Sequence, residues 1–206
     1  MADRPIIFSA PLVRALLDGR KTQTRRRLKP MRGVRIEEFQ EKGPHPSGIG
    51  TVFECPRDKL RAPYASGDRL WMREAHAFVG SCDPGLLVTR ADYPHCVPGH
   101  YENVPPASDI RWRPSIYMPR WASRLTLIVS DVRVQRVQDI SEEDAQAEGG
   151  EPVLVPPDAA FTPYTERFRD MWDAIHGPDA WAQNPWVAAI SFAVERRNID
   201  KETHDA

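Results

Sequence analysis

Lys21 and Thr24 are the residues whose types and spacing most directly suggest chemistry. A threonine hydroxyl is a poor nucleophile until a base takes its proton, and a neutral lysine amine can be that base, as acyl transfer to water requires. Positions three apart in an ideal strand point to opposite faces, so the pair meets only if the segment turns, and Thr22 is a local competitor. Neighbouring cations should favour the neutral amine of Lys21, and they are Arg20, Arg25 and Arg26.

The preceding residues predict a rigid element that positions this segment. Ser9 can cap a helix over residues 11–17, whose apolar positions are spaced for one buried face. Gly19 then ends the helix, because glycine accepts the left-handed backbone that closes a last turn. We therefore expect residues 21–26 to emerge as a directed turn or strand.

Further patterns predict an α+β fold. Alternating or apolar runs predict strands over residues 69–78, 125–134 and 186–194, and two segments predict helices, 142–148 and 164–175. The second helix should bury one stripe, made of Tyr164, Phe168, Met171, Trp172 and Ile175. Strands joined irregularly, with short helices at their ends, indicate a small curved β-barrel with peripheral helices.

The chain length of 206 residues suits one domain, with irregular insertions. Residues 29–66 and 80–114 are rich in Pro, Gly and charge, so we expect two long loops, the first with one short strand near residues 51–55. Residues 198–206 should form a disordered tail.

Composition limits the class of protein. No apolar run approaches a membrane span, and Met1 to Pro5 lack the features of a secretory signal, so we expect a cytoplasmic protein that does not engage membranes. The sequence has three cysteines, Cys55, Cys82 and Cys96. Their odd number, and spacings that match no recognised zinc pattern, predict free thiols and no metal site. The net charge is −1, yet residues 20–35 hold basic residues and no acidic one, which suits a phosphate-bearing or nucleoside ligand held at one place.

The segment Gly-Arg-Lys-Thr-Gln-Thr-Arg-Arg at residues 19–26 resembles the GRKTxTxR signature of the ASCH family, whose fold is a PUA-like β-barrel. The segment Gly-Asp-Arg-Leu-Trp-Met-Arg-Glu at residues 67–74 resembles a strand of larger, phage-associated ASCH proteins. Residues 115–124 and the Asn-Pro-Trp-Val segment at 184–187 are also similar to segments of those proteins.

Small bacterial ASCH proteins include amidohydrolases that remove the acetyl group from N4-acetylcytidine with a lysine, a threonine and a glutamate. The resemblance places these roles on Lys21, Thr24 and Glu148, whereas Glu142 and Glu143 look like exposed first-turn residues. It implies that Lys21 deprotonates Thr24, that Thr24 attacks the amide carbonyl, and that Glu148 assists proton transfer to the departing amine. It also implies that Arg26 binds substrate or steadies the oxyanion, and that no cofactor is needed.

This chain is about twice as long as those small enzymes, so the irregular stretches could reshape a pocket. Arg73 and Glu74 are candidate substrate-binding residues, although an ion-paired strand end explains them as well. Trp71 could stack on a base or face the core. The partner is then a modified cytosine nucleoside or base, with the oligomeric state open.

Two other functions stay open at this point. A PUA-like module that binds RNA or reads a modified nucleotide would suit the basic segment, although the near-neutral total charge weakens it. A ribonuclease is a third possibility, but only His76 and His176 lie in predicted regular elements.

Overall fold

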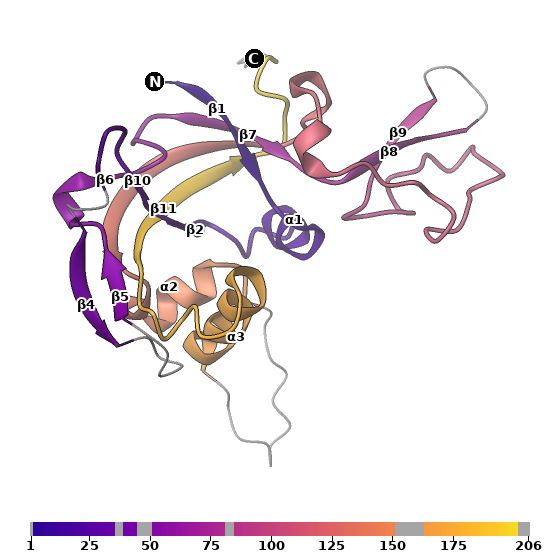
Figure 1. The fold of residues 1–206 in the computed structure, drawn as a ribbon. Helices are drawn as coiled ribbons and strands as arrows, with labels where there is room; N and C mark the ends of the chain where they lie inside the picture. Colours follow the sequence, from indigo (N-terminus) through magenta and orange to yellow (C-terminus); the bar gives the residue numbers. More distant parts are fainter. Residues whose placement is uncertain (1, 36–38, 45–50, 81–84, 151–162, 202–206) are drawn as a thin grey trace. The chain divides into compact units, whose positions relative to one another are not determined.

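The computed structural model describes residues 2–35, 39–44, 51–80, 85–150 and 163–201, and they form a mixed α+β structure (Figure 1). The chain divides into two compact units. Unit 1 contains Met1–Gly19, Gly67–Val129 and Phe192–Ala206, and unit 2 contains Arg20–Ser66 and Ser130–Ser191. The expectation of one domain over residues 1–206 stays a prediction. Within the described ranges, none of the helices combines the length and apolar character that a bilayer crossing requires.

A five-stranded mixed sheet has the order β1-β7-β10-β11-β2. Its strands are β1 (Asp3–Ile7), β7 (Arg69–Arg73), β10 (Thr126–Arg136), β11 (Trp186–Glu195) and β2 (Gln23–Arg27). Strands β1 and β7 are parallel, whereas β10 with β7 and β2 with β11 are antiparallel. Strands β10 and β11 each continue from one unit into the other. Among the described strands β1 and β2 are edges, so this sheet is not the closed barrel that the sequence led us to expect.

Helix α1 (Ala10–Leu17) follows β1 in unit 1, as the sequence predicts. Ser9 occupies the N-cap position without a side-chain capping bond, and Gly19 has a φ of 75°, the left-handed conformation that ends the helix. The helix buries Val13, Ala15 and Leu16.

The expected strand over residues 69–78 is two strands in unit 1. Strand β7 ends at Arg73, and β8 (His76–Val79) pairs with β9 (Leu86–Thr89), a strand that the expected second loop did not include. Leu70, Met72 and Glu74 occupy alternate positions and are all buried, so the buried face of β7 continues to the residue after its end. Short 3-10 helices, η3 (Ser115–Tyr117) and η4 (Arg120–Ala122), precede β10.

The structure describes the chain after β11 in unit 1 as far as Lys201, which includes the first residues of the tail expected from residue 198. Ile199 is only 4% exposed. The amide of Asn198 donates to the carbonyl oxygens of Ser123, Arg120 and Trp121, and Arg120 donates to the carboxylate of Asp200. These residues form no regular helix or strand, so the sequence shows no apolar periodicity here. Tertiary contacts hold them instead. The remainder of the expected tail, residues 202–206, lies outside the described residues.

In unit 2 the expected loop over residues 29–66 contains short paired strands. Strand β3 (Lys29–Pro30) pairs with β6 (Leu60–Arg61), and β4 (Gln40–Pro44) pairs with β5 (Thr51–Glu54), both antiparallel. A 3-10 helix, η2 (Arg57–Lys59), precedes β6. The prediction of a strand near residues 51–55 is confirmed, but its partner β4 lacks the alternating pattern that would have revealed it.

Helices α2 (Glu142–Ala147) and α3 (Tyr164–His176) lie beside each other in unit 2, as Figure 1 shows. A 3-10 helix, η5 (Val137–Asp139), precedes α2. Phe168 and Trp172 of α3 pack into a buried cluster with residues of α2 and β11. Ile175, expected in the same stripe, is instead 58% exposed, because it lies on the last turn beyond that cluster.

Candidate functional site

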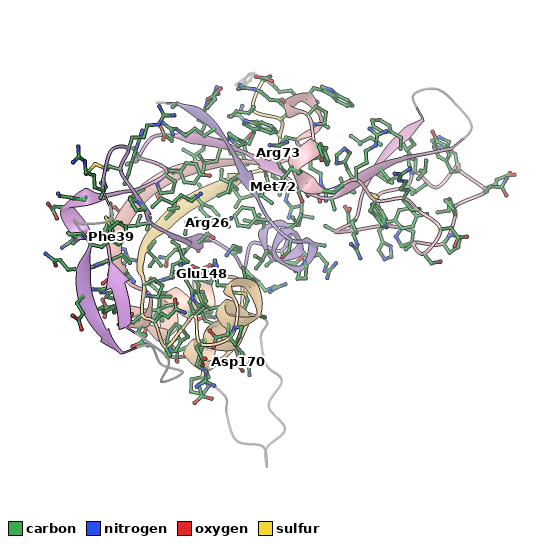
Figure 2. All side chains as sticks on the ribbon, in the orientation of Figure 1. Arg26, Phe39, Met72, Arg73, Glu148 and Asp170 are labelled. Carbon is green, nitrogen blue, oxygen red and sulfur yellow. The ribbon has the colours of Figure 1, made fainter. Side chains whose placement is uncertain are left out.

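The site in unit 2 forms where the segment before β2 meets the end of α2. Lys21 and Glu148 form an isolated antiparallel bridge, and the backbone N–H of Thr22 donates to the carbonyl of Ala147 at 2.9 Å. Glu148 is the C-cap of α2, and Gly149 follows it with a φ of 98°, so the left-handed closure of α2 fixes the backbone beside Glu148. Figure 2 labels Glu148 and Arg26 on the ribbon.

Lys21 and Glu148 make a direct buried contact. The ammonium nitrogen Nζ of Lys21 lies 2.8 Å from Oε2 of Glu148 and donates to the Glu148 carbonyl at 2.7 Å. Lys21 is 0% exposed and Glu148 is 4% exposed. Two of the three residues that the sequence assigned to catalysis therefore lie in contact.

Burial lowers the pKa of Lys21 below its ordinary value of 10.5, because the charged amine loses its hydration. The attraction of Glu148 opposes this effect, and the charges of Arg26 and Arg25 add to it. The sequence attributed the neutral amine to the neighbouring arginines. Desolvation is the larger cause, and it depends on the tertiary structure.

Arg25 completes a buried network that the sequence analysis did not assign. Its guanidinium donates to Oε1 of Glu148 at 3.1 Å, to Oδ2 of Asp144 at 2.7 Å and to Oε1 of Gln23 at 2.6 Å. The side chain of Arg25 is fully buried, and its guanidinium also lies 5.7 Å from the ring centre of Phe168. Two spacings in the sequence could have revealed this network. Residues 21, 23 and 25 are two apart and so face the same side of a strand, and Asp144 and Glu148 are four apart and so lie on the same side of a helix.

Thr24 is buried, but it lies on the opposite face of β2 from Gln23 and Arg25, since successive strand residues alternate. The hydrogen bonds that converge on Glu148 come from Lys21 and Arg25. Thr22 is exposed and lies just outside the strand. The contact of Thr24 with Lys21 that the proposed chemistry requires stays a prediction.

Arg26 is half-buried in β2, opposite Ala188 of β11. Burial lowers the pKa of its guanidinium, while the charge of Glu148 opposes that shift. Arg26 therefore acts electrostatically on the same carboxylate as Lys21 and Arg25, which is consistent with a cation close to the site.

The other predicted binding residues belong to unit 1, where Figure 2 labels Arg73. Glu74 is 1% exposed and forms a two-point ion pair with Arg124, whose distances are 2.8 and 3.1 Å. Burial raises the pKa of Glu74 and the ion pair opposes the shift. The Arg73 guanidinium lies 5.2 Å from the ring centre of the half-buried Trp71. Glu74 is thus ion-paired at the end of β7, whereas Arg73 lies against the ring of Trp71.

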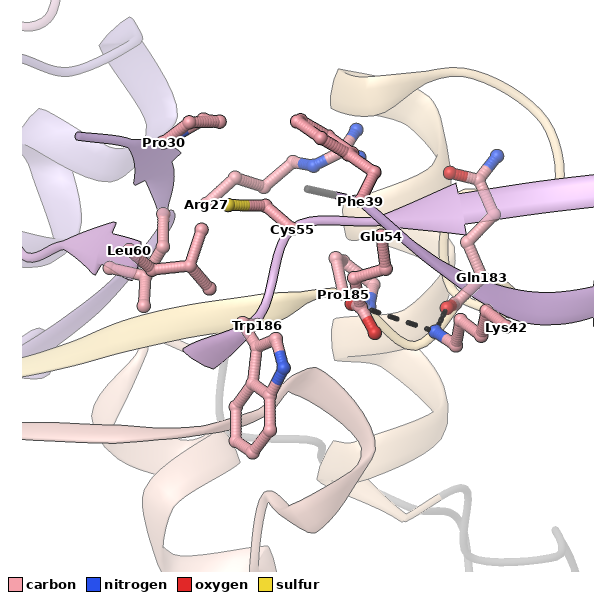
Figure 3. Close-up of a pocket in the computed structure, with 11 residues that line it drawn as sticks. Arg27, Pro30, Phe39, Lys42, Glu54, Cys55, Leu60, Gln183, Pro185 and Trp186 are labelled. Carbon is pink, nitrogen blue, oxygen red and sulfur yellow. Dashed lines mark hydrogen bonds and ion pairs between the residues drawn. The ribbon is translucent and has the colours of Figure 1, made fainter. Parts of the chain in front are cut away.

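A separate pocket of about 230 Å³ lies in unit 2 beside the β4–β5 pair and the start of β11 (Figure 3). Phe39 and Trp186 contribute aromatic rings to its lining, and Arg27 and Lys42 contribute cationic side chains. Lys42 donates to the carbonyls of Gln183 and Asn184, and Arg136 lies 4.0 Å from the ring centre of Trp186. The Asn-Pro-Trp segment singled out in the sequence therefore borders a cavity.

Groups of three or more His, Cys, Asp or Glu side chains placed to hold a metal ion do not occur among the described residues. Cys82 lies outside those residues. Comparisons with protein-family models, with curated proteins and with solved structures gave no match.

Proposed function

We propose that this chain is an amidohydrolase that removes acyl groups from N4-acylated cytosine or cytidine derivatives. The observation that carries the proposal is the buried contact between Lys21 and Glu148, at 2.8 Å. A lysine whose pKa is lowered by burial can supply a neutral amine, and a carboxylate beside it can accept and return a proton.

The reaction would proceed in two stages. Lys21 takes the hydroxyl proton of Thr24, whose oxygen forms a bond to the acyl carbon, and the C–N bond breaks as the cytosine amine receives a proton through Glu148. Water then attacks the acyl ester, the acid leaves, and the Thr24 hydroxyl is restored. Arg26 would stabilise the negative charge that develops on the carbonyl oxygen.

The resemblance of residues 19–26 to the ASCH signature supports this proposal. A PUA-like assignment of the fold is part of it, together with the roles of Trp71, Arg73 and Glu74 as candidate substrate-binding residues. The mixed sheet with few helices supports the α+β class alone, and the PUA-like part of the assignment rests on the resemblance.

Incubation with N4-acetylcytidine and a panel of other N4-acyl groups tests the proposal. We expect release of cytidine by the wild type and a loss of about a hundredfold or more in kcat for Lys21→Ala and Thr24→Ala. Thr22→Ala is the matched control, because it removes an exposed hydroxyl from the same segment and should retain activity. Failure of the wild type to release cytidine from every acyl substrate would contradict the proposal, and full activity of Thr24→Ala would remove the covalent step.

A second candidate is a module that binds RNA without catalysis, and the pocket in Figure 3 favours it. Aromatic rings and arginine side chains together suit stacked bases and phosphates, and Arg57 lies 5.3 Å from the ring centre of Trp186. This candidate predicts a salt-dependent affinity for structured RNA that is kept in Thr24→Ala and lost in Trp186→Ala. Binding that is equal in both variants would contradict a role for the pocket.

A further inference from the structure

We propose that Arg25 is a positioning residue that holds the Glu148 carboxylate beside Lys21 and supplies it with a second positive charge, so that Lys21 can release its proton. This inference rests on the proposed function and extends it to a residue that the resemblance did not assign. The observation behind it is that one buried carboxylate is shared by two cations, one on each oxygen.

The two oxygens of Glu148 have different partners. Lys21 Nζ contacts Oε2 at 2.8 Å, and Arg25 Nη1 contacts Oε1 at 3.1 Å. All three side chains are nearly excluded from solvent, with exposures of 0% for Lys21 and Arg25 and 4% for Glu148. Water therefore contributes little to the hydration of any charge at this point.

This sharing matters because a buried carboxylate without a counter-charge is costly. If Lys21 were its only partner, loss of the lysine proton would leave Glu148 alone, and the pair would resist that loss. Arginine remains charged at every pH at which the protein is folded. Arg25 therefore supplies a positive charge that remains beside Glu148 when Lys21 loses its proton. The loss then leaves no buried carboxylate without a counter-charge.

The guanidinium of Arg25 is itself held in place. Its second terminal nitrogen, Nη2, contacts Asp144 at 2.7 Å, one helical turn before Glu148, and Nη1 also reaches Gln23. Asp144 in turn accepts two hydrogen bonds from Arg133 at 3.0 Å and one from Gln23 at 3.1 Å. A planar fork can span two carboxylates on one helix, whereas an ammonium group cannot do so with fixed geometry.

The charged groups that act on Lys21 come from two segments. Glu148, at the end of α2, raises its pKa, whereas Arg25 and Arg26 of β2 lower it in addition to burial. Behind them, Asp144 forms ion pairs with both Arg25 and Arg133. Loss of the Arg25 charge should thus favour the protonated form of Lys21.

The experiment is a carbon-13 NMR titration of the full chain with labelled lysine side chains, in which the Lys21 signal is identified by its loss in Lys21→Arg. The other lysines are Lys29, Lys42, Lys59 and Lys201. We expect Arg25→Gln to raise the midpoint of Lys21 by about one pH unit, a tenfold fall in neutral amine at a given pH. Arg25→Lys should give a smaller rise, since it keeps a charge but loses the fork.

Arg133→Gln is the matched control, because it removes a cation that contacts Asp144 but not Glu148. Its Lys21 midpoint should equal that of the wild type. Equal midpoints in Arg25→Gln, Arg25→Lys and wild type would overturn the proposal, as would an equal rise in Arg133→Gln.

Two further measurements keep the test decisive. If Arg25→Gln does not fold, Arg25→Lys decides: a Lys21 midpoint equal to that of the wild type overturns the inference. If cytidine is released, the pH profile of kcat/KM in Arg25→Lys must shift with the NMR midpoint, which a purely structural role would not cause. The titration does not depend on activity, so an inactive wild type with the expected midpoints contradicts only the proposed function.

Discussion

At the scale of single residues, the site is defined by charges that are removed from water. Lys21, Arg25 and Glu148 are buried together, and each has a hydrogen-bonded partner of opposite charge. Electrostatic interactions are stronger in such surroundings than at a surface, so one charge sets the protonation of the next.

The first prediction at this scale concerns pH. A general base is active in its neutral form, so kcat/KM should be present above the pKa of Lys21 and lost as the pH falls through it. Because burial lowers that pKa, the midpoint should lie below 10.5. A pH–rate profile with N4-acetylcytidine measures it, and activity that stays constant as the pH falls would contradict Lys21 as the base.

At the scale of elements, the short helix α2 carries a residue of the candidate site and also contacts the start of α3. Its C-cap residue is Glu148, and Asp144 on the same helix binds Arg25. At its other end, Glu142 accepts hydrogen bonds from the backbone N–H groups of Tyr164 and Thr165, the first residues of α3. Glu142 is therefore half-buried and caps α3, which corrects the expectation that it is an exposed first-turn residue. Glu143 is exposed, as predicted.

The second prediction follows from this cap. Hydrogen bonds from Thr165 lower the pKa of Glu142 below its ordinary value of 4.5. The stabilisation that ionised Glu142 gives the folded state is therefore fully present above pH 4.5 and is lost as the pH falls through the lowered pKa. Glu142→Gln should lower the melting temperature at neutral pH and reduce the loss of stability on acidification below pH 4.5. Thermal unfolding from pH 7 to pH 3 measures this.

Glu143→Gln is the control for that experiment, because it makes the same change in the same helical turn at an exposed position. Its melting temperature should match that of the wild type throughout. If both variants behave alike, Glu142 does not contribute through the N-terminus of α3.

At the scale of the whole molecule, both compact units are assembled from segments that are distant in the sequence. In unit 1 the last described residues return to the core. Ile199 is buried, and Asn198 is bonded to the carbonyl of Ser123 at 2.7 Å. The stability of unit 1 should therefore depend in part on Asn198 and Ile199.

The third prediction tests that dependence. Ile199→Ala should lower the free energy of unfolding by about 2–5 kcal/mol, because it removes buried methyl groups and leaves a cavity. Ile175→Ala makes the identical chemical change at a side chain that is 58% exposed, and it should change stability by no more than about 0.5 kcal/mol. Urea unfolding measures both, and similar values for the two variants would show that residue 199 does not pack in the core.

The sequence by itself determined the local features of this protein. Gly19 and Gly149 predicted where helices end, since glycine readily adopts a positive φ, and the spacing of Phe168 and Trp172 predicted the buried face of α3. The class, α+β, followed from the same periodicities. These features depend on neighbouring residues and can be read within a short window.

Only the tertiary structure decided which charges meet. It joined Lys21 to Glu148, added Arg25 and Asp144 to them, and ordered the short strands and Ile199. It also left the described sheet open between β1 and β2, and it placed Ile175 in solvent. The physical reason is that burial and ion pairing between distant segments depend on how the chain folds back on itself, which no local period or propensity encodes.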